Sequence, residues 1–236
     1  MNTQAQKLRE LLTSKSIATA VGVYDGFTAK IVEQAGFDAA LISGAAVATS
    51  LQGLPDNGMI TLTEMADAAK RISSCVSIPV IADADNGYGN ALNVRRTVQE
   101  FELGGCAALQ LEDQASPKKC GHMDGKEVIP TIEHCRKIEM AAATRNEMLI
   151  LARTDAATVT GIDDAINRVN EYAKAGADFV IVDAPRTVED LKKIGERVQA
   201  PVMVNLVEGG KTPYLSKEEL QDLGFSIVCY PGVCTL

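Results

Sequence analysis

Three acidic side chains are the first residues of this sequence whose types and spacing could perform chemistry. Asp83 and Asp85 lie at the end of the apolar run 80–84, and Glu112 ends the next run, 108–112. Two positions apart on an extended segment, Asp83 and Asp85 point to the same side. Three unpaired carboxylates at short range repel one another, and oxygen-only ligands favour Mg²⁺ or Mn²⁺ over zinc. The pattern predicts a metal site; the alternative is a carboxylate network neutralised by Lys and Arg.

A second chemical feature is the polar segment 116–126, SPKKCGHMDGK, directly after the run that ends in Glu112. Two lysines before Cys120 favour its thiolate, and His122 can do the same or relay a proton. A polar loop of this length beyond a strand predicts an active-site lid at 116–127. The alternative is a surface cysteine in a basic turn. His134, in a helical pattern at 131–144, is expected to be structural.

Polar residues also end most of the other apolar runs, and together they predict a site at one edge of a sheet. Two glycine-containing stretches resemble nucleotide-binding motifs but do not match them, so no nucleotide cofactor is predicted. Residues 205–212 (NLVEGGKT) lack the first glycine of a phosphate-binding loop, and 87–89 (GYG) lack the third glycine of the dinucleotide fingerprint. The further candidate site residues at the strand ends are Ser43, Gly44, Ala45, Arg153, Asp183 and Asn205.

The elements that must position these residues follow one recurring pattern: a polar helical stretch, a glycine, and a short continuous apolar run. It occurs at 33–43, 102–112, 173–183 and 221–230. Continuous apolar runs are typical of parallel strands covered on both faces. Four further runs, at 17–23, 80–84, 149–152 and 202–205, bring the total to eight strands separated by helices.

Eight alternating units predict an α/β fold, a (β/α)₈ TIM-type barrel formed by residues 1–236 as a single domain, rather than an open doubly wound sheet. Only Pro231–Leu236 follow the eighth run, so the barrel is expected to lack its C-terminal eighth helix.

Composition narrows the function classes. The 236 residues carry 23 Lys and Arg against 31 Asp and Glu, a net charge of −8, which argues against nucleic-acid or anionic-membrane partners. No apolar run is long enough to span a bilayer, and residues 1–16 lack an apolar secretory core; a cytoplasmic protein is expected.

Six scattered cysteines without a CxxC pair argue against disulfide or zinc frameworks. Burial is expected for Cys75, Cys106, Cys135 and Cys229.

Seven motifs together make the sequence similar to one family, the isocitrate lyase / phosphoenolpyruvate mutase superfamily, from about residue 21 to 231. The KKCGH motif resembles its carbon–carbon lyase branch, which includes methylisocitrate lyase, 2,3-dimethylmalate lyase and petal-death-like proteins. The motifs are ISGAAVA (42–48), GLPD (53–56), DADNGYG (83–89), LEDQ (111–114), PKKCGH (117–122), ARTDA (152–156) and EGGKTP (208–213).

The resemblance implies roles for individual residues. Asp85 would hold Mg²⁺ directly, with Asp83 and Glu112 acting largely through water. Cys120 would be the general acid, with His122 beside it, and Arg153 would bind substrate. The remaining implied substrate-binding residues are Ser43, Gly44, Ala45, Asp56, Gly121, Asp183 and Asn205. Asp183 stands where the lyases usually have Glu.

The implied reaction is Mg²⁺-dependent cleavage of a 2-hydroxy dicarboxylate, of the 2-alkylmalate or 2-methylisocitrate type, to a 2-oxo acid such as pyruvate plus a carboxylic acid. Leu236 falls where methylisocitrate lyase places an arginine, which favours a dicarboxylate. The alternatives are an oxaloacetate-type hydrolase, a phosphonate mutase relative and a catalytically silent binding barrel. The resemblance also implies a homo-oligomer, a dimer or tetramer, whose C-terminal helices exchange between subunits.

Overall fold

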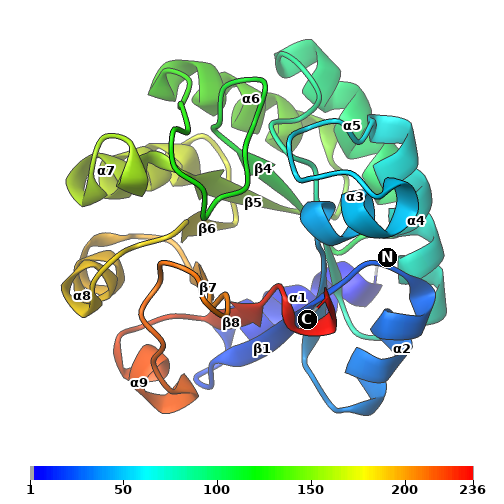
Figure 1. Cartoon of the computed structure of the whole chain (residues 1–236), viewed down its shortest axis with the longest axis horizontal. Coiled ribbons are helices and arrows are strands. Elements are labelled where there is room, and N and C mark those ends of the chain that lie inside the picture. Colours follow the sequence, from blue (N-terminus) through cyan, green and yellow to red (C-terminus); the bar gives the residue numbers. More distant parts are fainter. Residues whose placement is uncertain (1–2, 236) are drawn as a thin grey trace.

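Eight parallel strands close into a barrel in the computed structural model, which describes residues 3–235 (Figure 1). Each strand pairs with its sequence neighbours, and β1 pairs with β8, Ala20 lying opposite Cys229. This confirms the TIM-type barrel and excludes the open sheet. The strands are β1 (Ala18–Val23), β2 (Ala39–Ile42), β3 (Val80–Asp83), β4 (Ala108–Glu112), β5 (Leu149–Thr154), β6 (Phe179–Val182), β7 (Val202–Asn205) and β8 (Ile227–Tyr230).

The continuous apolar runs form these strands because both strand faces are covered. Every residue of β2, β3, β4 and β5 is buried. One face packs against the surrounding helices, and the other fills the barrel interior. β5 extends two residues beyond the predicted end at 152, which places Arg153 within the strand rather than after it.

The helices lie around the outside of the barrel, as Figure 1 shows. Several begin with a capping box, in which a side chain before the first turn and one in that turn satisfy each other's backbone N–H groups; Thr61 and Glu64 do so in α4. The helices are α1 (Thr3–Thr13), α2 (Gly26–Gln34), α3 (Gly44–Gln52), α4 (Leu62–Cys75), α5 (Ala91–Leu103), α6 (Thr131–Thr144), α7 (Ile162–Lys174), α8 (Val188–Arg197) and α9 (Lys217–Asp222), with 3₁₀ turns η1 (Ala156–Thr158) and η2 (Val233–Thr235).

Helix α1 covers the amino end of the barrel, behind the strands in the view of Figure 1. Its buried side chains Ala5, Leu8 and Leu12 belong to the same apolar cluster as Ala18 and Ala20 of β1. Because this end is filled by apolar side chains, polar chemistry is confined to the carboxyl ends of the strands, where barrel active sites form.

After β8, the described residues form only the 3₁₀ turn η2 and no further α-helix, as the sequence predicted. Leu236, on which the comparison with an arginine rests, lies outside the described residues. Among residues 3–235, no helix has both the length and the apolar character needed to cross a membrane.

The six cysteines are all free. Cys106, Cys135 and Cys229 are buried as predicted, whereas the prediction for Cys75 was wrong. Cys75 ends α4 and is partly exposed, with its Sγ directed to the Ile72 carbonyl at 3.1 Å. A helical position near a C-terminus lies close to solvent even when its neighbours one turn back are buried.

Candidate active site

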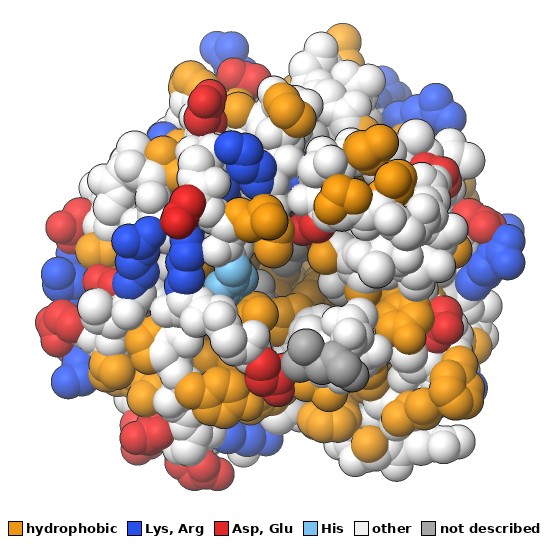
Figure 2. All heavy atoms as spheres, viewed as in Figure 1, with side chains coloured by type: hydrophobic (Ala, Val, Ile, Leu, Met, Phe, Trp, Pro, Cys, Tyr) orange, Lys and Arg blue, Asp and Glu red, His pale blue; other side chains and the backbone are white. Residues whose placement is uncertain are grey.

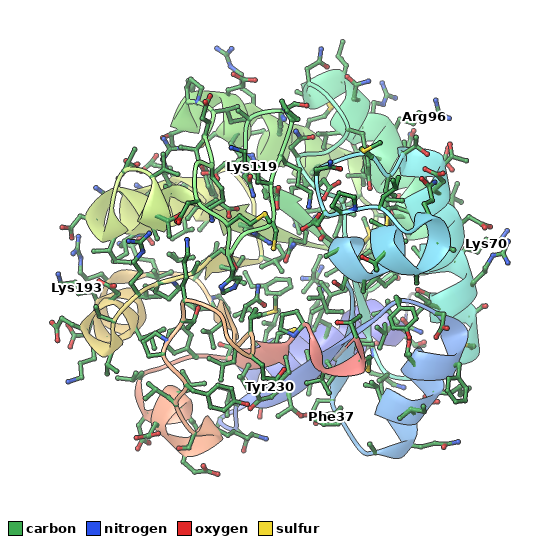
Figure 3. All side chains as sticks on the ribbon, viewed as in Figure 1. Phe37, Lys70, Arg96, Lys119, Lys193 and Tyr230 are labelled. Carbon is green, nitrogen blue, oxygen red and sulfur yellow. The ribbon has the colours of Figure 1, made fainter. Side chains whose placement is uncertain are left out.

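A cavity of about 600 Å³ opens at the carboxyl ends of the strands. Figure 2 shows this face of the molecule hollowed at its centre. Figure 3 places Lys119, from the segment after β4, and Tyr230, at the end of β8, on opposite sides of the central opening. Ten of the predicted site residues line the cavity: Ser43, Ala45, Asp56, Asp83, Cys120, Gly121, His122, Arg153, Asp183 and Asn205.

The other three predicted residues lie against the cavity wall. The Gly44 N–H donates to Asp83 Oδ2 at 3.3 Å. Asp85 pairs with Lys118, a lining residue, and Glu112 Oε2 lies 3.6 Å from Nη1 of Arg153. The structure therefore brings all the sequence-predicted residues to one end of the barrel.

Asp83 and Asp85 meet in a way the sequence did not predict. Asp85 has a φ of 47°, so the backbone turns at this residue and the expectation of an extended segment from 83 to 85 was wrong. The turn lets the Asp85 N–H donate to Asp83 Oδ1 at 3.1 Å. Gln110 Nε2 donates to the same oxygen at 3.2 Å. Neutral amide groups thus hold Asp83 in place. Because they carry no charge, the negative charge of Asp83 would be compensated by a cation.

Glu112 is the least satisfied of the three carboxylates. Its side chain is fully buried, and neither carboxylate oxygen accepts a hydrogen bond from a described residue. Burial raises the pKa of Glu112 well above its usual range. Burial, reinforced by the charge of Asp83, also raises the pKa of Asp85 to about 6. In both cases burial is the main cause, because a buried carboxylate loses the solvation that favours its charged form.

Lys118 supplies part of that compensation. Its Nζ lies 2.5 Å from Asp56 Oδ1 and 2.7 Å from Asp85 Oδ1. Burial acts to lower the pKa of Lys118, but the carboxylates around it, Glu112 and Asp85 foremost, outweigh burial and raise it. The alternative of a network neutralised by Lys and Arg is therefore met in part, since Lys118 pairs with Asp56 and Asp85 and Arg153 lies 3.6 Å from Glu112.

These donors fit a hard divalent cation. In the described residues, no three His, Cys, Asp or Glu side chains are gathered closely enough to hold a metal as they stand. However, the two Glu112 oxygens are buried without hydrogen-bond partners, and Asp85 Oδ1 has only its ion pair with Lys118. Every candidate ligand is a carboxylate oxygen, the donor type that Mg²⁺ prefers, often through retained water.

The other end of the cavity, which meets the acidic cluster where Arg153 lies 3.6 Å from Glu112, is built around Arg153, and its carboxylates are paired. Arg153 Nε and Nη2 donate to the two oxygens of Asp155 at 2.9 and 3.0 Å, and Nη2 also donates to Asp183 Oδ2 at 3.0 Å. Lys126 Nζ lies 2.7 Å from Asp155 Oδ1. Although burial acts to raise the pKa of Asp155, Arg153 and Lys126 lower it to about 2. This end therefore stays ionised and ordered at neutral pH.

The segment after β4 reaches into this end through Gly121. A Cβ at position 121 would lie 2.1 Å from Asp183 Oδ2 and 2.2 Å from Arg153 Nη2, so a larger residue there would displace this ion pair. Lys126 Nζ also donates to the Gly121 carbonyl. One lysine thus joins the segment that carries Cys120 to the buried carboxylate Asp155.

Cys120 lies between the two ends, and its environment differs from the prediction. The expectation that the adjacent lysines favour its thiolate was wrong, because Lys118 pairs with Asp56 and Asp85 while Lys119 Nζ donates to the Gly125 carbonyl. Burial raises the pKa of the Cys120 thiol. A protonated thiol suits a proton donor better than a nucleophile.

Ser43 and Asn205 complete the polar lining. Ser43 is the N-cap of α3, and its Oγ accepts from the Ala46 N–H at 3.3 Å. The first turn of α3 therefore faces the cavity, where helix N-termini favour anions. Asn205 Nδ2 donates to Asp183 Oδ1 at 3.1 Å, which fixes the carboxylate that pairs with Arg153.

Asp113, which follows Glu112 at the end of the fourth predicted strand but was not among the predicted site residues, orders the arginine end without lining the cavity. Thr154 Oγ1 donates to its Oδ2 at 2.6 Å, Tyr172 OH donates to the same oxygen at 2.8 Å, and the Asp155 N–H donates to Oδ1 at 2.9 Å. The sequence carried a signal for Gln110, a polar residue inside an apolar strand, and for Asp113, directly after that strand, but none for Lys126, whose partner Asp155 lies 29 positions away.

The two histidines differ as predicted. His122 lines the cavity, whereas His134 is fully buried against the edge of Tyr172, with ring centroids 4.6 Å apart. Burial lowers the pKa of His134 to about 3, so it stays neutral and structural.

Comparisons with known sequences point to one family. The sequence profile of the phosphoenolpyruvate phosphomutase family matches residues 8–235. The chain is 47% identical to the 2,3-dimethylmalate lyase of Eubacterium barkeri over 233 residues, which cover 98% of this chain and 80% of that protein. It is 44% identical to the 2-methylisocitrate lyase of Aeropyrum pernix, over 95% of this chain and 72% of the relative.

Solved structures agree. An oxaloacetate acetylhydrolase in complex with the inhibitor 3,3-difluorooxalacetate superposes with a TM-score of 0.94 at 33% identity, over 98% of this chain and 80% of that one. A 2,3-dimethylmalate lyase superposes with a TM-score of 0.92 at 34% identity, over 98% and 79%. With its barrel, its carboxylate cluster and its KKCGH segment, the chain belongs to the phosphoenolpyruvate mutase / isocitrate lyase superfamily.

Proposed function

We propose that this chain is a Mg²⁺-dependent carbon–carbon lyase that cleaves a 2-hydroxy dicarboxylate into a 2-oxo acid and a carboxylic acid. One observation carries the proposal: a single cavity joins a carboxylate cluster with unpartnered oxygens to an arginine whose Nε and Nη2 are paired with carboxylates, and a protonated thiol also lines it. Relatives at 44–47% identity are named as lyases of 2,3-dimethylmalate, a dicarboxylate, and of 2-methylisocitrate, a tricarboxylate, which supports a carbon–carbon lyase.

Arg153 has one nitrogen suited to a substrate oxygen. Its Nε and Nη2 are committed to Asp155 and Asp183, while Nη1 lies 3.6 Å from Glu112, beyond hydrogen-bond range. A guanidinium held in this way presents its remaining donors in a fixed direction, which favours a planar carboxylate. Ser43 and the N–H groups of Gly44 and Ala45, at the start of α3, are suited to a second carboxylate or to a developing enediolate.

The acidic end is the place for the metal. Asp85 would hold Mg²⁺ directly, and Asp83 and Glu112 would do so largely through water. Bound there, Mg²⁺ supplies Lewis-acid polarisation of the substrate's oxygen atoms. Lys118 pairs with Asp56 and Asp85, and its charge opposes the rise in the pKa of Asp85 that burial causes.

Cleavage then breaks the bond between C2 and C3 of the substrate. The 2-hydroxyl proton passes to a carboxylate at the acidic end as C2 becomes a carbonyl. The electron pair of the broken bond stays on C3 and delocalises into the attached carboxylate. The Cys120 thiol donates its proton to C3, a general-acid step for which a raised pKa keeps the proton in place.

The segment 116–127 acts as a lid in this proposal. It carries Cys120, Gly121 and His122 into the cavity, and Lys126 joins it to Asp155. A closed lid would exclude water, which would otherwise compete with Cys120 to protonate the carbanion.

A second candidate, an oxaloacetate-type hydrolase, is favoured by one observation: the oxaloacetate acetylhydrolase structure superposes with a TM-score of 0.94. The same cavity suits a hydrated 2-oxo dicarboxylate, because cleavage of that compound also leaves a carbanion next to a carboxylate. Product identity separates the two activities.

The test is a panel of 2,3-dimethylmalate, 2-methylisocitrate and oxaloacetate, each with Mg²⁺ and with products identified by NMR. We expect pyruvate and propionate from dimethylmalate. The kcat/KM for dimethylmalate should exceed that for 2-methylisocitrate, the tricarboxylate, by about ten- to a hundredfold. This is the effect of one hydrogen bond to a charged group, here the arginine contact that Leu236 would not provide. A clear preference for 2-methylisocitrate would overturn the dicarboxylate assignment. Oxalate and acetate from oxaloacetate, with no cleavage of the hydroxy acids, would overturn the lyase in favour of the hydrolase.

We also infer a cytoplasmic homo-oligomer. The exposed side chains of Phe27, Leu92 and Leu103, each more than 70% accessible, are apolar surface that subunit contacts could cover. Light scattering after size exclusion tests the assembly: a dimer or tetramer is expected, and a monomer at micromolar concentration contradicts it.

A further inference from the structure

His122 makes an unusual contact for a residue on a polar surface segment. Its Nδ1 accepts a hydrogen bond from the backbone N–H of Lys211 at 3.0 Å. Lys211 lies in the loop between β7 and α9, almost ninety positions away in the chain. A backbone N–H can only donate, so the nitrogen that accepts from it carries no proton.

The loop is shaped to bring that N–H to the imidazole. The Gly210 N–H donates to the Val207 carbonyl at 2.9 Å, which closes a turn beside the ring. A Cβ at position 210 would lie 2.8 Å from His122 Nδ1 and 2.9 Å from Cε1. The imidazole would have to shift to make room for that Cβ, and so would Val207, whose Cβ lies 2.9 Å from the same position. Glycine at 210 therefore permits the close approach.

A separate contact joins the same two segments at the surface. Lys211 Nζ pairs with Asp124 Oδ1 at 2.5 Å, and Asp124 is largely exposed. The Lys211 backbone thus holds His122, while the Lys211 side chain holds Asp124. The two contacts can be removed separately.

The other imidazole nitrogen of His122, Nε2, is the one available to contact a substrate. His122 Nε2 is buried and has no hydrogen-bond partner among the described residues, although the ring lines the cavity. In a neutral imidazole whose Nδ1 accepts, the proton is on Nε2. Burial lowers the pKa of His122, which favours the neutral ring.

We propose that Gly210 and Lys211 are positioning residues that hold His122 in the tautomer protonated on Nε2, so that His122 donates a hydrogen bond to a substrate oxygen and does not remove a proton. The identity of that acceptor, a carboxylate or enediolate oxygen, rests on the proposed function. The tautomer itself does not, because it follows from contacts within the chain.

The test is the nitrogen-15 spectrum of the imidazoles in the whole chain, without substrate, at neutral pH. The chain has only two histidines, so a His122→Gln variant assigns the signals. We expect His122 to show an unprotonated Nδ1 and a protonated Nε2. Gly210→Ala should displace the ring and introduce the other tautomer or the imidazolium. It should also lower kcat/KM by about ten- to a hundredfold, the range for one hydrogen bond to a charged group.

Two controls separate this contact from general loop damage. Lys211→Ala keeps the backbone N–H and loses only the pair with Asp124, so the His122 tautomer should be unchanged. Gly209→Ala strains the same loop, because Gly209 has a φ of 68°, but a Cβ there has no neighbour within 4 Å. It should leave the tautomer as in the wild type.

A wild-type His122 protonated on Nδ1, or on both nitrogens, would overturn the proposal even if Gly210→Ala failed to fold. A wild-type tautomer in folded Gly210→Ala, or the same change in Gly209→Ala, would overturn the role of Gly210. Failure of the lyase reaction is a separate result: if no hydroxy acid is cleaved but the tautomer is as expected, the positioning stands and the proposed function falls.

Discussion

The two ends of the cavity solve the problem of buried charge in opposite ways. At the arginine end, Arg153 and Lys126 face Asp155 and Asp183 at hydrogen-bond distance, and the pKa of Asp155 falls to about 2. At the acidic end, one ammonium group, Lys118, faces several carboxylates, and the pKa of Asp85 rises to about 6.

The difference indicates that the two ends of the cavity are suited to different ligands. A network whose members satisfy one another is rigid and presents a fixed surface, which suits recognition of an anionic group. A cluster of buried carboxylates with unpartnered oxygens costs stability until a cation arrives. We therefore assign substrate orientation to the arginine end and metal binding to the acidic end.

The largest expected effect comes from removing the direct metal ligand. Asp85→Ala should lower kcat/KM by about 10³-fold or more, since metal polarisation contributes several kcal/mol and Asp85 is the residue proposed to bind the metal directly. Excess Mg²⁺ should rescue the variant poorly. EDTA should silence the wild type, and added Mg²⁺ should restore it. Full activity in EDTA would refute the assignment of a metal to this end.

Cys120→Ser tests the group between the two ends. Serine is nearly the same size but has a far higher pKa, so it donates a proton poorly; kcat should fall by about 10²- to 10⁴-fold with a modest change in KM. Cys75→Ser, which changes a partly exposed cysteine outside the cavity, is the matched control and should keep its turnover. Unchanged turnover in a folded Cys120→Ser variant would show that another residue donates the proton.

Asp155→Asn should damage stability where Asp85→Asn does not. It leaves buried Lys126 without its carboxylate partner and weakens the hold on Arg153, a loss of about 3 kcal/mol or a fall in Tm of about 6–12 °C. Asp85→Asn removes a carboxylate that Asp83 repels, and Lys118 keeps Asp56, so Tm in metal-free protein should stay the same or rise. Equal falls in Tm for the two variants would remove the distinction between the ends.

The pH dependence of stability should differ in the same sense, with a smaller effect. The lowered pKa of Asp155 contributes stability above about pH 4 that is lost as the pH falls toward 2. The raised pKa of Asp85 acts in the other direction: metal-free protein loses stability as the pH rises from about 4 to 6. Denaturation of Asp85→Asn at a series of pH values should lack that second loss, and an unchanged profile would contradict the raised pKa.

The sequence predicted the barrel well because its signals are local. Each apolar run is continuous, four of the eight are preceded by a helix-ending glycine, and the carboxyl ends of parallel strands meet at one edge. The same rule brought Asp83, Glu112, Arg153 and Asn205 together without knowledge of any contact.

What the sequence did not predict depends on partners distant in the chain or on backbone turns. The lysines beside Cys120 suggested a thiolate, but Lys118 extends to Asp56 and Asp85 instead. Asp85 leaves the extended conformation at a φ of 47°, which no residue spacing reveals. Lys126 meets Asp155 across 29 positions. Pairing of charges at this range is a property of the folded cavity, so it had to be observed.

The most direct test of the division between the two ends is the thermal shift produced by Mg²⁺ in the wild type, Asp85→Asn and Asp155→Asn. At about 100 times its Kd, a ligand stabilises the folded state by about 2.7 kcal/mol, or about 5–11 °C in Tm for a chain of this size. The wild type and Asp155→Asn should show this rise relative to EDTA, and Asp85→Asn should not. No rise in the wild type, or an equal rise in Asp85→Asn, would contradict the account.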